Sequence, residues 1–186
     1  AARQRAAQEL SQKISQEMHA LAMSSGRFVV QLTVAAPSPN GLEQIEFLVS
    51  ANQGMEPRPL HKVASGGELS RISLALQVTV SQVASVPVLV FDEVDVGIGG
   101  GVAEVVGKML RRLGEHYQVL CVTHLPQVAS RGNQHWRVSK QAQDGQTRSR
   151  IEQLDTPQRV EEIARMLGGL DITETTRKHA AEMLTA

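Results

Sequence analysis

The sequence predicts an α/β fold in which a parallel sheet is flanked by helices. Two apolar runs, Val88–Phe91 and Val119–Thr123, have the length and composition of buried strands. Helical and strand patterns alternate along this part of the chain, at about 67–84, 87–92, 101–114 and 117–123. Such alternation favours parallel strands joined by right-handed crossovers. At 186 residues, the chain is long enough for one domain with a substantial core.

The first 25 residues are expected to form a helix. They contain no proline or glycine, and Ser24, Ser25 and Gly26 then interrupt the pattern. Apolar residues recur in alternating steps of three and four, broken by Glu17, at Ala7, Leu10, Ile14 and Leu21. The stripe is too short to establish a coiled coil, but it fits the last turns of a longer one.

Two β-hairpins and two further helices account for most of the remaining chain. The first hairpin is expected from the β-rich runs Phe28–Ala35 and Leu42–Ser50, and the second from Gln134–Lys140 and Thr147–Leu154 around Asp144 and Gly145. A proline-containing loop, 51–62, connects the first hairpin to the helix near residue 67. The last two helices are expected at about 157–167 and 173–184.

The composition indicates a globular protein of a reducing, cytoplasmic compartment. Hydrophobic residues make up 41% of the chain, and no apolar stretch approaches the roughly 20 residues of a membrane helix. The N-terminus carries no apolar signal core, and the single cysteine, Cys121, lies in an apolar run typical of a core strand.

The charge balance leaves DNA binding open. The 19 basic and 19 acidic residues cancel, so any contact with nucleic acid must be local. A basic set around the second predicted hairpin comprises Arg131, Arg137, Lys140, Arg148 and Arg150. Such a cluster is either a DNA-binding patch or an ordinary solvated face.

A serine and two glycines, Ser65, Gly66 and Gly67, stand where the helix near residue 67 begins. The N-terminus of a helix exposes unpaired N–H groups and the positive end of the helix dipole, and glycine lets an anion approach the backbone. This arrangement suits a phosphate. The simpler alternative is a serine N-cap followed by two flexible residues.

Chemically useful side chains follow both apolar strands. Asp92 and Glu93 follow the first and His124 follows the second, and ligands of open α/β sheets bind at this edge. Asp92 suits a Mg²⁺ shell, Glu93 a base that orients water, and His124 a contact with the γ-phosphate of ATP. An Asp–Glu pair at a strand end is also commonly a solvated terminus, and a lone histidine often makes one backbone bond.

Three other sites fit the sequence poorly. The segment from Gly101 to Lys108 lacks the glycine and the Ser or Thr of a phosphate-binding loop, and it reads as an ordinary helix. The glycines at 97–101 fail the dinucleotide fingerprint because Val102 replaces the last glycine. Ser65 does not lie in a Gly-x-Ser-x-Gly elbow, which argues against a serine hydrolase.

The motifs together resemble the ATPase heads of the ABC type. Residues 63–71 look like the signature motif, with Glu68 where transporters usually carry Gln; residues 88–93 look like the Walker B strand, and residues 94–97 look like the D-loop. His124 resembles the switch histidine. The segments 91–100 and 122–129 are similar to the RecN family of bacterial DNA-repair proteins, which are relatives of the structural-maintenance-of-chromosomes (SMC) proteins.

This resemblance implies the C-terminal lobe of an ATPase head. Residues 1–25 would end a coiled-coil helix and residues 26–186 would form the lobe, while a separate N-terminal lobe would carry the Walker A loop that this chain lacks. Two such heads would sandwich ATP and Mg²⁺ in a homodimer that acts on DNA in double-strand-break repair in the bacterial cytoplasm, at the nucleoid.

The resemblance also implies a role for each site residue. Asp92 would hold the metal, and Glu93 and His124 would serve catalysis at the nucleotide of their own head. The residues expected to contact nucleotide are Ser65, Gly66, Gly67, Glu68 and Asp95. Asp95 is further expected along the dimer seam, coupling the two sites. The alternative is a non-catalytic module that dimerises or docks on DNA without ATP turnover.

Overall fold

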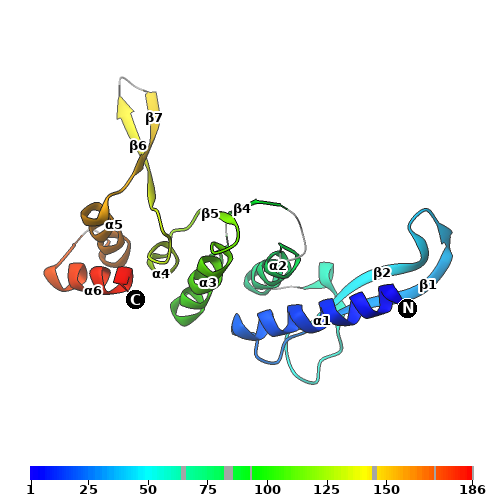
Figure 1. Ribbon diagram of the computed structural model, residues 1–186. Coiled ribbons are helices and arrows are strands. Elements are labelled where there is room, and N and C mark those ends of the chain that lie inside the picture. The colour runs from blue at the N-terminus through cyan, green and yellow to red at the C-terminus, as the bar shows by residue number, and fades with distance from the viewer. Residues whose placement is uncertain (64–65, 82–85, 93, 144–145, 170, 186) are drawn as a thin grey trace.

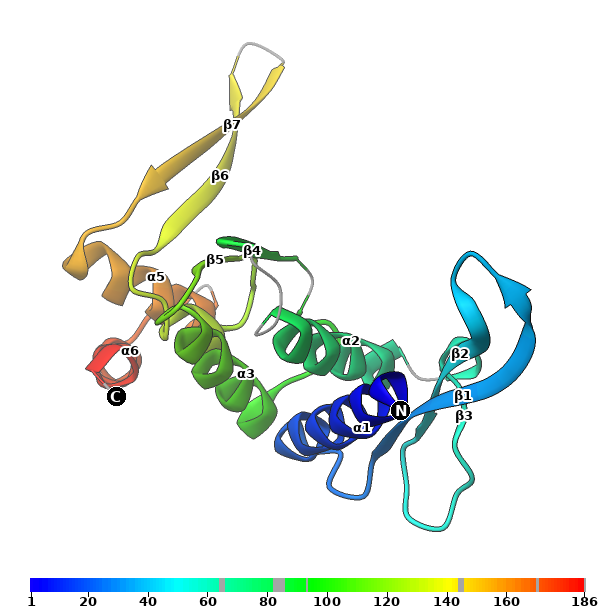
Figure 2. The same ribbon diagram turned by 45° about the vertical axis from the view of Figure 1, so that its right-hand side comes forward.

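The protein is described from a computed structural model, which covers residues 1–63, 66–81, 86–92, 94–143, 146–169 and 171–185. The elements lie along an extended path (Figure 1). Helix α1 and the sheet of β1 and β2 occupy one end, α2 and α3 the middle, and α5 and α6 the other end. The hairpin of β6 and β7 projects away from the body of the molecule (Figures 1 and 2).

The N-terminal helix and first hairpin are confirmed with small changes of length. Helix α1 spans Ala2–Ala20, and strands β1 (Arg27–Ser38) and β2 (Gly41–Ser50) pair in antiparallel fashion. A short strand, β3 (Arg58–Pro59), extends this sheet, and a 3₁₀ turn, η1 (Leu60–Lys62), follows it. Neither was predicted, because two or three residues carry no periodicity.

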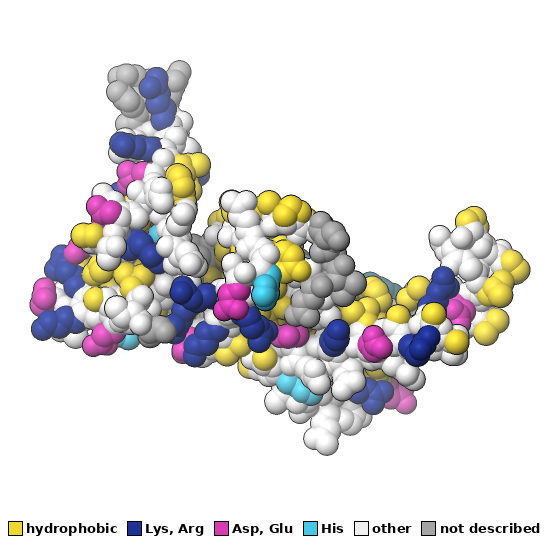
Figure 3. All heavy atoms as spheres, in the orientation of Figure 1, with side chains coloured by type: hydrophobic (Ala, Val, Ile, Leu, Met, Phe, Trp, Pro, Cys, Tyr) yellow, Lys and Arg dark blue, Asp and Glu magenta, His cyan; other side chains and the backbone are white. Residues whose placement is uncertain are grey.

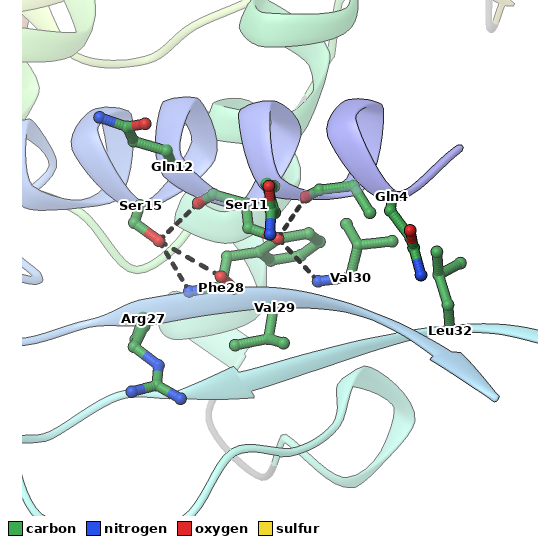
Figure 4. Close-up of a pocket in the computed structure, with 11 residues that line it drawn as sticks. Gln4, Ser11, Gln12, Ser15, Arg27, Phe28, Val29, Val30 and Leu32 are labelled. Carbon is green, nitrogen blue, oxygen red and sulfur yellow. Dashed lines mark hydrogen bonds between the residues drawn. The ribbon is translucent and has the colours of Figure 1, made fainter. Parts of the chain in front are cut away.

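Two serines of α1 bind the free edge of β1 (Figure 4). The backbone N–H of Phe28 donates to the Oγ of Ser15 at 2.9 Å, and the N–H of Val30 donates to the Oγ of Ser11 at 2.9 Å. These bonds occupy donors on an edge strand that would otherwise be open to another chain. Helix α1 therefore covers both the face and part of the edge of this sheet.

The alternating central segment is confirmed as helices around two parallel strands. Helix α2 (Gly66–Ser81) leads to β4 (Val88–Phe91), and helix α3 (Gly100–Leu113) leads to β5 (Gln118–Cys121). Strands β4 and β5 pair in parallel, with Phe91 opposite Cys121. Within the described residues this sheet has two strands, fewer than a parallel sheet buried on both faces normally contains.

The segment from Gly101 to Lys108 lies within α3, as the sequence predicted. Gly107 faces the short helix α4 (Pro126–Ala129), where an added Cβ would lie 2.8 Å from the carbonyl oxygen of Gln127. This glycine therefore permits close helix packing, and it belongs to no phosphate loop.

The second hairpin and the last two helices are also confirmed. Strands β6 (Trp136–Gln143) and β7 (Gln146–Gln153) pair in antiparallel fashion, and α5 (Thr156–Gly168) and α6 (Glu174–Thr185) pack against each other. Asp155 begins α5 with a capping box, its carboxylate accepting from the N–H of Gln158 at 2.8 Å.

The main core joins α1, the first sheet, α2, β4 and α3. Its fully buried side chains include Ile14, Phe28, Ile72, Val78 and Val106. A smaller core between α5 and α6 is built on Ile163, Ala164 and Ala180. None of the helices in the described residues is long and apolar enough to span a membrane.

Candidate nucleotide site

The parallel pairing of β4 and β5 brings the predicted groups to one edge of the sheet. Both strands end at the same level, so the segment that begins with Asp92 and the segment Val122–His124 leave the sheet side by side. Asp92 is exposed, and the His124 side chain is 72% exposed. Both are open to a ligand at this edge. Ser65 and Glu93, which the sequence assigned to phosphate binding and to the catalytic base, lie outside the described residues.

Asp95 organises the loop after β5. Its Oδ2 atom accepts the hydroxyl of Thr123 at 2.6 Å and the backbone N–H of His124 at 2.8 Å, and it lies 3.0 Å from the ring Nδ1 of His124. Burial acts to raise the pKa of Asp95, but the hydrogen bonds from Thr123 and His124 and the nearby imidazole outweigh it, so the pKa is lowered. Asp95 is therefore held as a carboxylate.

The structure gives Asp95 contacts that the sequence did not predict. Its side chain is only 4% exposed and is directed to residues of its own chain, while its contact with nucleotide and its place at a dimer seam stay predictions. The sequence could not reveal this, because the contacts join residues 28 and 29 positions apart. The signal that was present is the threonine directly before His124, a residue able to donate to a carboxylate.

The start of α2 packs against the loop that follows β4. Gly97 has a φ of +71°, and an added Cβ would lie 2.9 Å from the Cα of Gly67. An added Cβ on Gly67 would lie 3.2 Å from the carbonyl oxygen of Gly97. The two glycines thus allow a backbone contact that side chains would prevent. This contact joins the signature-like segment to the loop that carries Asp95.

The first turn of α2 has the features of an anion site. An added Cβ on Gly66 would meet nothing within 4 Å, so this residue leaves open space beside the helix N-terminus. Glu68 lies in the same turn, and Arg71 follows one turn later. The Nε atom of Arg71 is buried without a hydrogen-bond partner among the described residues. The open space at Gly66 suits an anion, whereas the buried Nε of Arg71 is not exposed to one in this structure.

The metal assignment rests on Asp92 alone. Within the described ranges, no three His, Cys, Asp or Glu side chains gather closely enough to hold a metal ion. Mg²⁺ binds through as few as one or two carboxylates, with water and phosphate oxygens completing its shell, so the assignment of Asp92 stays a prediction.

Cys121 is a core residue, as the sequence predicted. Its side chain packs against the main core, and burial together with the charges of Asp95 and Asp92 raises its pKa to about 12. The thiol is therefore protonated at neutral pH and is a poor nucleophile or metal ligand.

One face of the β4–β5 sheet is uncovered, which the sequence analysis missed. Val88, Val90, Leu120 and Val122 share this face and are all exposed, whereas Leu89 and Phe91 on the other face pack into the core. The apolar runs predicted strands buried on both sides. An exposed apolar patch on a parallel sheet marks a surface for another protein element.

The predicted basic patch is divided by the structure. Arg137 pairs with Glu152 and Glu162, and Arg131 lies 3.3 Å from Glu104. Lys140, Arg148 and Arg150 are exposed on the projecting hairpin, where basic side chains are visible in Figure 3. Arg137 lies on the same hairpin, and Arg150 is 3.8 Å from Glu152, so Lys140 and Arg148 are the members of this set without an ion pair among the described residues.

The fold matches that of known SMC head domains. The chain superposes with a TM-score of 0.67 and 17% identity on the Smc head domain with coiled coil and joint from Pyrococcus yayanosii, covering 86% of this chain and 29% of that one. A chain from work on ATP-driven dimerization and DNA-stimulated activation of SMC ATPases gives a TM-score of 0.61 at 16% identity, with 90% and 96% covered. The molecule therefore has the fold of SMC head domains.

The sequence relatives define the family. The chain is 52% identical over 185 residues to the DNA repair protein RecN of Xylella fastidiosa (strain 9a5c), and 53% identical over 186 residues to RecN of Vibrio cholerae. Identity to RecN of Bacillus subtilis (strain 168) is 36%. These matches cover 96% or more of this chain and about one third of each relative. No family model matches. The chain belongs to the RecN family and spans about a third of the length of these relatives.

Proposed function

We propose that this chain is the C-terminal half of the ATP-hydrolysing head of a RecN-like protein that acts in recombinational repair of DNA double-strand breaks. The observation that carries the proposal is the common edge of β4 and β5, where Asp92 and His124 are both open to a ligand. A signature-like helix start packs against the loop leaving the same sheet. Fold and identity to RecN proteins support the same assignment.

Each residue has a defined task in this proposal. Asp92 would hold Mg²⁺, which neutralises charge on the phosphate oxygens, and His124 would contact the γ-phosphate. Glu93 would accept a proton from the attacking water. Ser65, Gly66, Gly67 and Glu68 would close over the nucleotide of a second head. One chain would therefore serve two sites in a homodimer.

The Walker A loop must come from another segment. The apolar face of β4 and β5 and the short length of that sheet support docking of an N-terminal lobe here. ATP binding would close two complete heads and hydrolysis would reopen them. The site of action would be the bacterial nucleoid in the cytoplasm.

The first test is ATP hydrolysis by the chain alone and mixed with a separately produced N-terminal lobe. We expect turnover only in the mixture and its loss in Glu93→Gln, since the amide cannot accept the proton of water. Nucleotide binding should survive in that variant. Steady-state hydrolysis by Glu93→Gln at the wild-type rate would refute the assignment of the base.

A second test concerns dimer closure. We expect Ser65→Arg to block ATP-dependent dimerisation of the complete head, measured by light scattering, because a bulky cation would occupy the phosphate position. ATP binding by the separate head should persist, since Ser65 is assigned to the opposite nucleotide. A normal ATP-dependent dimer would contradict the role of this segment.

A non-catalytic DNA-docking module is the second candidate, favoured by the projecting hairpin. Arg148 and Arg150 lie on one face of it, on alternate positions of β7, with Ser139 and Gln141 opposite. If these arginines contact phosphates, replacing both by glutamine should lower the slope of log affinity against log salt by about 2. Arg177→Gln, at an ion pair with Glu161 on α5, is the control. An unchanged slope would exclude the hairpin as a DNA contact.

A further inference from the structure

We propose that Asp95 is a positioning residue that fixes His124 in a single tautomer, with the proton on Nδ1 and with Nε2 directed to the ligand edge. The geometry of three residues carries this inference: Asp95, Thr123 and His124. Its consequence for phosphate contact rests on the proposed function, whereas the tautomer itself does not.

The first step concerns the oxygen that faces the ring. Oδ2 of Asp95 lies 3.0 Å from Nδ1 of His124. An unprotonated Nδ1 would place its lone pair against a carboxylate oxygen, which is repulsive, whereas a protonated Nδ1 places a positive hydrogen there. Which ring nitrogen carries the proton is set by the partner of the other atom. Nδ1 therefore carries a proton whether the ring is neutral or charged.

The second step concerns how rigidly the carboxylate is held. The same Oδ2 accepts the Thr123 hydroxyl at 2.6 Å and the His124 backbone N–H at 2.8 Å. The Thr123 hydroxyl in turn accepts the N–H of Leu125 at 3.0 Å. These bonds fix Oδ2 and the backbone from which the imidazole projects, so the oxygen is held in place beside Nδ1.

The third step concerns the atom left for a ligand. The His124 side chain is 72% exposed, while Asp95 is buried. Nε2 is then the nitrogen available at the ligand edge. It carries a lone pair when the ring is neutral and an N–H when the ring is charged. A neutral ring in this tautomer would therefore present a hydrogen-bond acceptor, Nε2, to a ligand at this edge.

This arrangement gives Asp95 a role within its own chain. The loop that carries Asp95 also carries Gly97, whose backbone meets Gly67 at the start of α2. If α2 shifts on closing over a nucleotide, Gly67 would therefore displace Gly97 and, through the same loop, Asp95. The displacement of Asp95 would then change the orientation of His124. The histidine would then be set by the position of the signature-like helix.

The test is the tautomer of His124, measured by NMR on the 186-residue chain labelled with ring-¹⁵N histidine. There are six histidines, and the His124 signals are assigned by their loss in His124→Gln. Two-bond couplings between ring protons and nitrogens distinguish the two neutral forms. We expect the Nδ1–H form in the wild type. An Nε2–H form, or a mixture, in the wild type would overturn the proposal without any variant.

Three variants separate positioning from general damage. Asp95→Ala should release the ring to a mixture of tautomers, whereas Asp95→Asn, whose amide oxygen still accepts, should retain Nδ1–H. Thr123→Val removes one bond to Oδ2 and should also retain it. Persistence of Nδ1–H in Asp95→Ala, or its loss in Thr123→Val, would refute the role given to Asp95. Backbone amide spectra confirm that each variant is folded.

A kinetic measurement on the head completed with an N-terminal lobe tests the consequence. We expect Asp95→Ala to lower kcat roughly 10- to 100-fold with the affinity for ATP unchanged, as for groups that orient a ligand through another residue. A weakened affinity with unchanged kcat would refute this consequence. If the wild-type head does not hydrolyse ATP, the proposed function fails, and the NMR result still decides the tautomer.

Discussion

Replacing Val90 and Val122 together by threonine tests whether the uncovered face of the β4–β5 sheet binds the N-terminal lobe. The two side chains are 67% and 62% exposed in this chain; Val90 lies on β4, and Val122 directly follows the adjacent parallel strand β5. Threonine keeps the shape and the β-branching of valine, so the strands themselves should be little affected.

The expected loss follows from the exposed fractions. Removing one methyl group from an interface costs about 0.8 kcal/mol, and placing a hydroxyl there costs about 0.5 to 2 kcal/mol. Since most of each side chain is still exposed here, most of this cost falls on association. Scaled by the exposed fractions, the total for two sites is about 1.7 to 3.6 kcal/mol, which corresponds to roughly 20- to 400-fold weaker binding.

The assay is isothermal titration of the chain with the separate N-terminal lobe. Val138→Thr is the matched control, because Val138 is 64% exposed on the β6–β7 hairpin, outside this face. The control should bind as the wild type does. Equal weakening by the control and the double variant, or unchanged binding by the double variant, would refute the reasoning.

Two further predictions concern stability. Gly97→Ala should lower the free energy of unfolding by about 2 to 3 kcal/mol in urea titration, because φ is +71° and the new Cβ would meet the Cα of Gly67; Gly99→Ala, where an added Cβ meets nothing within 4 Å, is the control, and equal effects would exclude the contact as the cause. Glu162→Gln should lower stability at neutral pH by about 1 to 3 kcal/mol. Burial acts to raise the pKa of Glu162, but its bonds with Arg165 and Arg137 prevail and lower it below 4.5, so its contribution is present above that value and lost as pH falls through the folded-state pKa. The free energy of unfolding should therefore fall less on acidification in the variant than in the wild type. Parallel profiles of this free energy against pH for the two proteins would contradict the prediction.

The strand ends were predictable because their signals are local. Two short apolar runs, each following a helical pattern, imply parallel strands, and parallel strands end at one edge. That logic predicts that Asp92 and His124 leave the sheet at the same edge, as they do in the structure. The Gly101–Lys108 segment was also interpreted correctly, because its residues failed a specific spacing.

What the sequence did not reveal depends on contacts between distant residues. The burial of Asp95 requires Thr123 and His124, which reach it only once β4 and β5 pair. The close approach of Gly67 and Gly97 likewise depends on how α2 lies against a loop 30 residues away. An apolar pattern predicts that a strand face is covered, but it does not indicate whether the same chain or another segment covers it. The exposed face with Val88 and Val90 was therefore not predicted.

The two serine bonds between α1 and β1 have a mechanical consequence. Ser11 and Ser15 are four residues apart on a helix, about 6 Å along its axis, and the strand donors they bind, at Phe28 and Val30, are two residues apart, about 6.7 Å along the strand. The two spacings nearly coincide, so both hydrogen bonds can form at the same time. Sliding α1 by a single residue would disengage both. A pull along α1 is thus passed to the sheet as a displacement of β1, because the helix cannot slide along the strand while both bonds are intact.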